Sequence, residues 1–74
     1  MIDVILFHSS SEAMWASRVL KKNKIEHKLI SVPRHLGSDC GYCVSLSKTD
    51  SPNAMEFIRT EKVPFDRLEQ NVTI

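Results

Sequence analysis

The alternation of apolar and polar side chains predicts four short strands. They are expected at residues 2–7, 25–32, 42–47 and 63–70. In the second strand Leu29 is expected to point inward, and in the third Val44 and Cys43 are expected to face opposite sides of the sheet. Because proline cannot donate to a strand ladder, Pro33 ends the second strand and Pro64 places the last one at a sheet edge or a strand start.

A helical period predicts the first helix over residues 12–23, which are mostly good helix formers. Its buried stripe is expected to contain Ala13, Ala16, Val19 and Leu20. Ser9 and Glu12 have capping-box spacing, in which the serine oxygen accepts a hydrogen bond from the first turn. Asn23 is expected to end the helix in the left-handed conformation. Trp15 lies off the stripe, which fits either a partly exposed packing residue or a contact for a partner.

The second helix is expected to begin with Ser51 as its N-cap and Pro52 in its first turn, and to end near Glu61. The buried stripe of this helix is expected to contain Ala54, Met55 and Ile58. The predicted order is strand, helix, strand, strand, helix, strand, which is the ferredoxin-like arrangement. We therefore expect an α+β fold of βαββαβ order, with an antiparallel sheet and both helices on one face.

Length and charge limit the function. A chain of 74 residues is expected to form a single domain, residues 1–74, with a thin core, so any site lies on a loop or in a shallow groove. Ten Lys and Arg residues balance nine Asp and Glu residues, which argues against nucleic-acid binding. A local basic run at residues 21–28 is interpreted as the solvated end of a helix, with a phosphate-binding patch as the less favoured reading.

The chain is expected to be cytoplasmic and not membrane-bound. Its longest apolar run, residues 4–7, is far shorter than the roughly 20 residues that a spanning helix needs. The N-terminal residues do not have the pattern of a signal peptide. Two cysteines are too few for a disulfide framework, so both thiols are expected to be reduced.

The loop between the second and third strands carries Pro33-Arg34-His35-Leu36-Gly37-Ser38-Asp39-Cys40-Gly41. This pattern resembles that of the selenium/sulfur carrier-like family of small bacterial proteins. It consists of a Pro-Arg pair, a leucine two residues later and a small residue before Cys-Gly. The resemblance covers nearly the whole chain. It departs from the family pattern at Lys24, where members usually have glycine, and after Cys40-Gly41, where Tyr42 and Cys43 replace aliphatic residues.

The resemblance implies that Cys40 carries or transfers sulfur or selenium, with protein partners that donate and accept the atom. A carrier thiol must be accessible and partly ionised. Gly41 leaves the thiol unshielded, and Arg34 and Ser38 are expected to shape the loop or stabilise the anion. No cofactor and no metal are expected, and the protein is interpreted as a carrier without turnover of its own.

Three alternatives stay open. Cys40 and Cys43 have the Cys-x-x-Cys spacing of dithiol redox proteins, although in an extended strand their Cα atoms lie about 10 Å apart and a disulfide needs roughly 7 Å or less. A metal site with one of His8, His27 or His35 is the weakest reading, since only one cysteine pair is present. Alternatively, the chain is a non-enzymatic interaction module, and Cys40 is a structural cysteine.

Overall fold

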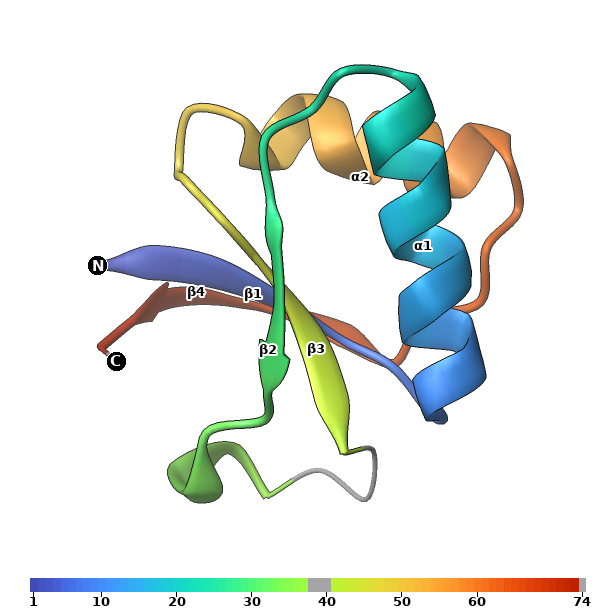
Figure 1. Cartoon of the computed structure of the whole chain (residues 1–74). Coiled ribbons are helices and arrows are strands. Elements are labelled where there is room, and N and C mark those ends of the chain that lie inside the picture. The colour runs from blue at the N-terminus through green and yellow to red at the C-terminus, as the bar shows by residue number, and fades with distance from the viewer. Residues whose placement is uncertain (38–40, 74) are drawn as a thin grey trace.

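The structure, a computed structural model, describes residues 1–37 and 41–73. Its elements follow the order predicted from the sequence (Figure 1). They are β1 (Ile2–Leu6), α1 (Ser10–Lys22), β2 (Lys28–Ser31), the 3-10 turn η1 (Arg34–Leu36), β3 (Tyr42–Leu46), α2 (Ser51–Thr60) and β4 (Arg67–Val72).

The four strands form one antiparallel sheet in the order β2-β3-β1-β4. Both helices lie on the same side of this sheet (Figure 1). This arrangement confirms the expected α+β, ferredoxin-like fold. Strands β1 and β3 are central, and β2 and β4 form the edges; Pro64 lies before β4 rather than within it.

The main core lies between the sheet and the two helices. It joins inward side chains of the sheet, such as Ile5 and Val44, to the buried stripes of both helices. The predicted helix residues Ala13, Ala16, Val19, Leu20, Ala54, Met55 and Ile58 are all buried. Trp15, which lies off the stripe, is 40% exposed.

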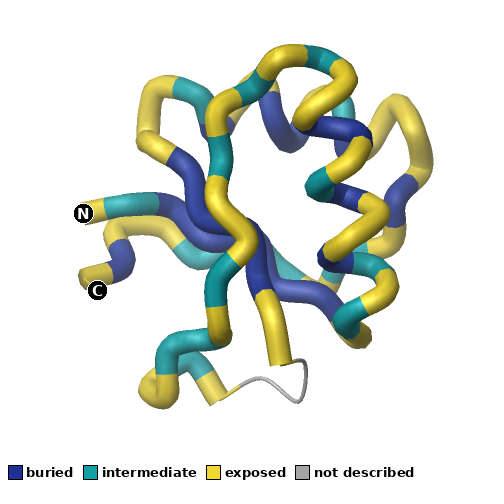
Figure 2. Tube along the Cα trace, viewed as in Figure 1, coloured by how far each residue is buried: buried dark blue, intermediate teal, exposed yellow. Residues whose placement is uncertain are grey.

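A second, smaller apolar cluster lies on the sheet face that points away from the helices, called the open face below. Its buried members are Val4, Leu6, Cys43 and Val72, and the half-buried Ile2, Ile30, Val32 and Leu36 pack against them. Val44 and Cys43 therefore face opposite sides of β3, as their alternation predicted. Figure 2 shows the two central strands as the most buried part of the sheet.

The start of α1 is capped as the sequence predicts. Ser9 is the N-cap, and its side chain accepts a hydrogen bond of 3.3 Å from the Glu12 amide. The Glu12 carboxylate in turn accepts one of 2.9 Å from the His8 amide, one residue before the cap. The helix begins at Ser10, two residues earlier than expected.

The predicted N-cap of α2 was wrong by one residue. Asp50 occupies the cap, and Ser51 is the first helical residue. The turn before the helix is held by Ser47, whose hydroxyl donates to the Asp50 carboxylate and accepts from the Asp50 amide, both at 3.1 Å. Ser51 is buried and supports a carboxylate, Asp3, rather than capping the helix.

The left-handed residue after α1 is Lys24, not Asn23. Asn23 has φ −95°, whereas Lys24 has φ 60°. The Ile25 amide then donates to the Leu20 carbonyl at 2.9 Å, which is the hydrogen bond of a Schellman motif. A glycine is best suited to this position, so the sequence departure at Lys24 falls where the backbone favours glycine.

Two strand predictions also need correction. Strand β2 is limited to four residues, and Leu29 is 39% exposed rather than buried. Leu29 pairs with the buried Val44, but β2 is the edge strand, where the packing against the helices ends. Strand β4 begins at Arg67, because residues 63–65 form an irregular segment that leads from α2 to the sheet.

Candidate functional site: the Cys40 loop

The sequence places the candidate chemistry in residues 33–41, called the Cys40 loop below. Cys40 and Ser38 lie outside the described residues. The structure does describe Arg34, Gly41 and the nearby Cys43. The site is therefore built from the two flanks of the loop and from the residues that hold them.

The first flank is a short turn that begins at Pro33. Proline fixes its own φ, here −57°, and turns the chain out of β2. Residues 34–36 then form η1, and Gly37 ends it in the left-handed conformation with φ 60°. Because side chains are disfavoured at this φ, glycine suits position 37.

The turn is anchored to the sheet by Leu36. Its side chain packs against the open-face cluster. Its carbonyl oxygen accepts a 2.7 Å hydrogen bond from Nη2 of Arg67, on the opposite edge strand. The first flank of the loop is thus held both by an apolar contact and by a charged donor.

Arg67 is itself held by two carboxylates. Its Nε donates to Glu69 at 2.8 Å and its Nη1 to Asp66 at 2.7 Å. The hydrogen bond to Glu69 and the charges of both carboxylates outweigh partial burial and raise the pKa of the Arg67 guanidinium above its ordinary value. Since all three contacts use different nitrogens, the planar fork is fixed in an orientation that suits the Leu36 carbonyl.

The second flank returns to the sheet at Gly41. The Val32 amide donates to the Gly41 carbonyl at 3.2 Å, so the two ends of the Cys40 loop are joined by a backbone hydrogen bond. Gly41 is exposed, and a Cβ built on it would lie 3.8 Å from the Ser10 hydroxyl oxygen. The residue after Cys40 therefore lies against the first residue of α1.

Arg34 and His35, in the first flank of the loop, lie at the surface. The side chains of Arg34 and His35 are exposed on η1, and within the described part of the chain neither forms an ion pair. Arg34 therefore carries its positive charge at the surface of the loop.

Cys43 lies in a different environment from the loop. It is fully buried in β3 among the side chains of the open-face cluster, and its Sγ lies 3.9 Å from the Ser31 carbonyl oxygen. Because it belongs to a regular strand, it is held by the pairing of Cys43 with Leu6 on one side and Ile30 on the other. Cys43 therefore packs within the apolar cluster on the open face of the sheet.

The comparison with protein families gives a match over most of the chain. The model of the family described as "Putative Se/S carrier protein-like" matches residues 3–69. The chain belongs to this family. The match spans both flanks of the Cys40 loop and ends within β4, and it confirms the family that the sequence resembles. The comparisons with curated proteins and with solved structures found no match.

Two further observations concern metals and membranes. Among the described residues, no three His, Cys, Asp or Glu side chains gather in a way that could hold a metal ion. Within the same part of the chain, neither helix has the length and apolar character needed to cross a membrane.

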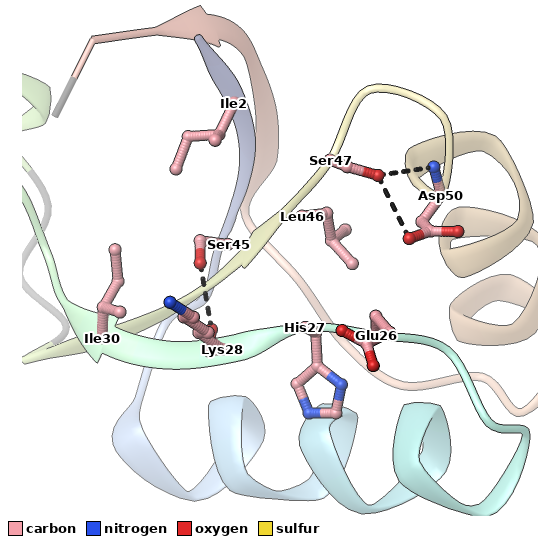
Figure 3. A pocket seen from close by; sticks show the side chains of 9 residues that line it. All are labelled: Ile2, Glu26, His27, Lys28, Ile30, Ser45, Leu46, Ser47 and Asp50. Carbon is pink, nitrogen blue, oxygen red and sulfur yellow. Dashed lines mark hydrogen bonds between the residues drawn. The ribbon is translucent and has the colours of Figure 1, made fainter.

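This member of the carrier-like family also has a groove at the other end of the sheet (Figure 3). Its volume is about 520 Å³, and the small side chain of Ser45 lies between the flanking Ile2 and Ile30. The Ser45 hydroxyl bonds the Lys28 carbonyl at 3.5 Å, so the β2 backbone closes one side. The remaining lining residues are Glu26, His27, Lys28, Leu46, Ser47 and Asp50.

Sequence reasoning missed Arg67 as part of the loop region. No local pattern connects it to Leu36, which lies 31 residues earlier. The nearest signal is the alternation of Arg67 and Glu69 on one face of a predicted strand, and it does not reveal which element the guanidinium reaches.

Proposed function

We propose that this protein carries sulfur or selenium on Cys40. Membership of the carrier-like family is the observation on which the proposal depends. The described flanks add support, because the two ends of the loop are bonded to each other and, through Leu36, to the sheet. The protein needs no catalytic turnover of its own, since one partner protein donates the atom and another accepts it.

The chemistry of loading needs only a nucleophilic thiolate. The Cys40 sulfur attacks the outer sulfur of a donor protein's persulfide, a new S–S bond forms on Cys40, and the donor's S–S bond breaks as its thiolate leaves. Delivery repeats the exchange in the other direction, to an acceptor. Selenium follows the same sequence with an S–Se bond. No oxidant or reductant is consumed in either transfer.

The neighbouring residues have supporting roles in this proposal. Gly41, which is exposed and carries no side chain, leaves room for a partner to approach Cys40. Arg34, which is exposed on η1, provides a positive charge at the surface of the loop that favours an anionic sulfur. Ser38 is proposed to donate a hydrogen bond to the transferred atom.

A dithiol mechanism with Cys43 has less support. A resolving thiol must reach its partner and be open to exchange, whereas Cys43 is fully buried in a paired strand on the open face. We therefore assign Cys43 no part in transfer. Cytoplasmic location, where thiols stay reduced, is part of the same proposal.

Loading by a cysteine desulfurase tests the proposal. The protein is incubated with the desulfurase and cysteine, and its intact mass is measured without reductant. We expect a gain of one sulfur atom in the wild type and in Cys43→Ala, and none in Cys40→Ser. An unmodified wild-type protein whose Cys40 also alkylates no faster than free cysteine contradicts the proposal.

An interaction module without sulfur chemistry makes a different prediction. In that case Cys40→Ser retains partner binding and the cellular function of the wild type. The carrier proposal predicts that Cys40→Ser still binds its partners but no longer supports their sulfur or selenium transfer. Genetic complementation with the Cys40→Ser variant separates the two.

A further inference from the structure

The positive charge of this chain is concentrated in the stretch of sequence that runs from the end of α1 through β2 to η1, where Lys22 also pairs with Glu61. Five of its ten basic residues lie between positions 21 and 36, whereas only one of its nine acidic residues lies there. These basic residues are Lys21, Lys22, Lys24, Lys28 and Arg34, and all of them are exposed. The segment thus has a net charge of +4, while the rest of the chain has −3, against +1 overall.

Strand β2 also presents an open sheet edge. Among the described residues it pairs only with β3, so the backbone N–H and C=O groups of every second residue point outward. Leu29 on β2 and Tyr42 on β3 lie on one face near this edge and are 39% and 43% exposed. A β-bulge, the usual protection of such an edge, is absent from the described β2–β3 pairing.

The other edge is protected. The pairing of β4 with β1 is interrupted between Ile2 and Val4, and Asn71 has a left-handed φ of 59°. Arg67 and Glu69 form an ion pair along the strand. A bulge and charged side chains are the features by which natural sheets block the addition of a strand. Strand β2 is short and carries Lys28, but its described pairing with β3 is regular, so of the two edges it is the more open to another strand.

We propose that β2 binds an acidic, extended segment of a partner protein as a fifth strand of the sheet. The exposed cations of residues 21–36 attract such a segment, and the edge supplies its backbone hydrogen bonds. Alternate side chains of the added strand point to the open face, where the groove lies beside Lys28 and Ile30. An apolar side chain fits there.

The position of the edge connects this binding to the proposed function. Strand β2 leads directly through Pro33 to η1, so a strand added to it runs alongside the entrance of the Cys40 loop. The identity of the partner as a donor or acceptor rests on the proposed function. The binding itself uses no atom of Cys40.

Peptide titration of the ¹⁵N-labelled protein, followed by amide shifts and hydrogen exchange, tests the proposal. The probe is a short peptide of alternating glutamate and valine. We expect shift changes and slower exchange to concentrate at β2, Lys28–Ser31. The same peptide with lysine for glutamate, and the acidic peptide with N-methylated alternate amides, are expected to have no such effect.

Charge variants provide the matched control. Lys28→Glu is expected to weaken binding of the acidic peptide by roughly fivefold, since an attraction becomes a repulsion at a surface site. Arg59→Glu makes the same change on α2, where the residue is exposed, and is expected to leave binding unchanged.

The proposal is overturned by an absence of response at β2, by an equal response to the N-methylated peptide, or by stronger binding of a single-stranded oligonucleotide at these lysines. Cys40→Ser is expected to bind the acidic peptide like the wild type. Normal peptide binding without desulfurase loading contradicts only the carrier function. Normal desulfurase loading without peptide binding contradicts only the binding of a strand at β2.

Discussion

Arg67 on β4 donates a 2.7 Å hydrogen bond to the carbonyl oxygen of Leu36, which lies 31 residues earlier in the turn that leads to Cys40. The two residues come from opposite sides of the sheet, because Leu36 follows β2 and Arg67 opens β4. The entrance of the loop is therefore fixed relative to the whole width of the sheet rather than to its own strand alone.

Replacing Arg67 with methionine tests this anchor. The methionine keeps an apolar stem but removes the donors, so η1 is expected to open more often while the sheet persists. Hydrogen exchange at the Leu36 and Gly37 amides should become faster than in the wild type. Arg59→Met, an equivalent change at an exposed site on α2, should leave these amides unchanged. Unaltered exchange in Arg67→Met contradicts the anchor.

Burial of Cys43 predicts a clear difference in thiol accessibility. In the folded protein an alkylating reagent is expected to leave Cys43 unmodified, and denaturant should expose it. Peptide mapping by mass spectrometry gives this result residue by residue. Modification of Cys43 at the rate of free cysteine in the folded protein contradicts its place in the open-face cluster.

The same burial predicts the effect of substitution. Cys43→Ser places a hydroxyl among aliphatic side chains, which is expected to lower the free energy of unfolding by about 1–3 kcal/mol. Cys43→Val, which keeps the site apolar, should cost less, and urea denaturation compares the two. Equal stability of both variants is the result that excludes an apolar environment.

The order of elements and the buried stripes were predictable, because short-range periodicity determines them. Val44 and Cys43 alternate in a strand whatever its neighbours are, and the stripe of α1 follows from its helical period. The exposure of Leu29 was not predictable in this way. Alternation shows the face of a residue, whereas exposure depends on whether the strand is central or at an edge.

The candidate site was predictable only in part. The loop and its glycine residues follow from local sequence, but the hydrogen bond from Arg67 to Leu36 depends on the strand order and on the register of β4 with β1. Likewise, the burial of Cys43 depends on a cluster whose other buried members, such as Val4 and Val72, come from strands distant in sequence.

Each helix is followed, just after its C-cap, by a lysine in a conformation that favours glycine. Lys24 has φ 60° and Lys62 has φ 58°, and in each case the next amide closes a Schellman motif. Lys24→Gly and Lys62→Gly are each expected to stabilise the fold by about 0.5–1 kcal/mol, because relief of left-handed strain exceeds the added chain entropy. Thermal melting of each variant measures the gain. Lys21→Gly inside α1 is the control, and it should destabilise the protein.

Asp3 predicts a pH dependence of stability. This carboxylate is 1% exposed in β1, and burial alone would raise its pKa. Hydrogen bonds from the Ser51 side chain and the Asn71 amide, together with Lys48 at 3.6 Å, outweigh burial and lower the pKa below its ordinary value of 3.8. The folded state therefore favours the charged form.

The sign of the dependence follows from this direction. A lowered folded-state pKa gives stability that is complete above the ordinary value of 3.8, which the unfolded chain has, and is lost as the pH falls through the folded-state value. Urea denaturation between pH 6 and strongly acidic conditions, roughly pH 2, should show this loss in the wild type. In Asp3→Asn the loss should be smaller, and stability at neutral pH should fall by about 1–3 kcal/mol. Glu56→Gln, at an exposed site on α2, should retain the wild-type profile. A profile in Asp3→Asn parallel to that of the wild type would mean that Ser51, Asn71 and Lys48 do not hold the charged carboxylate in solution.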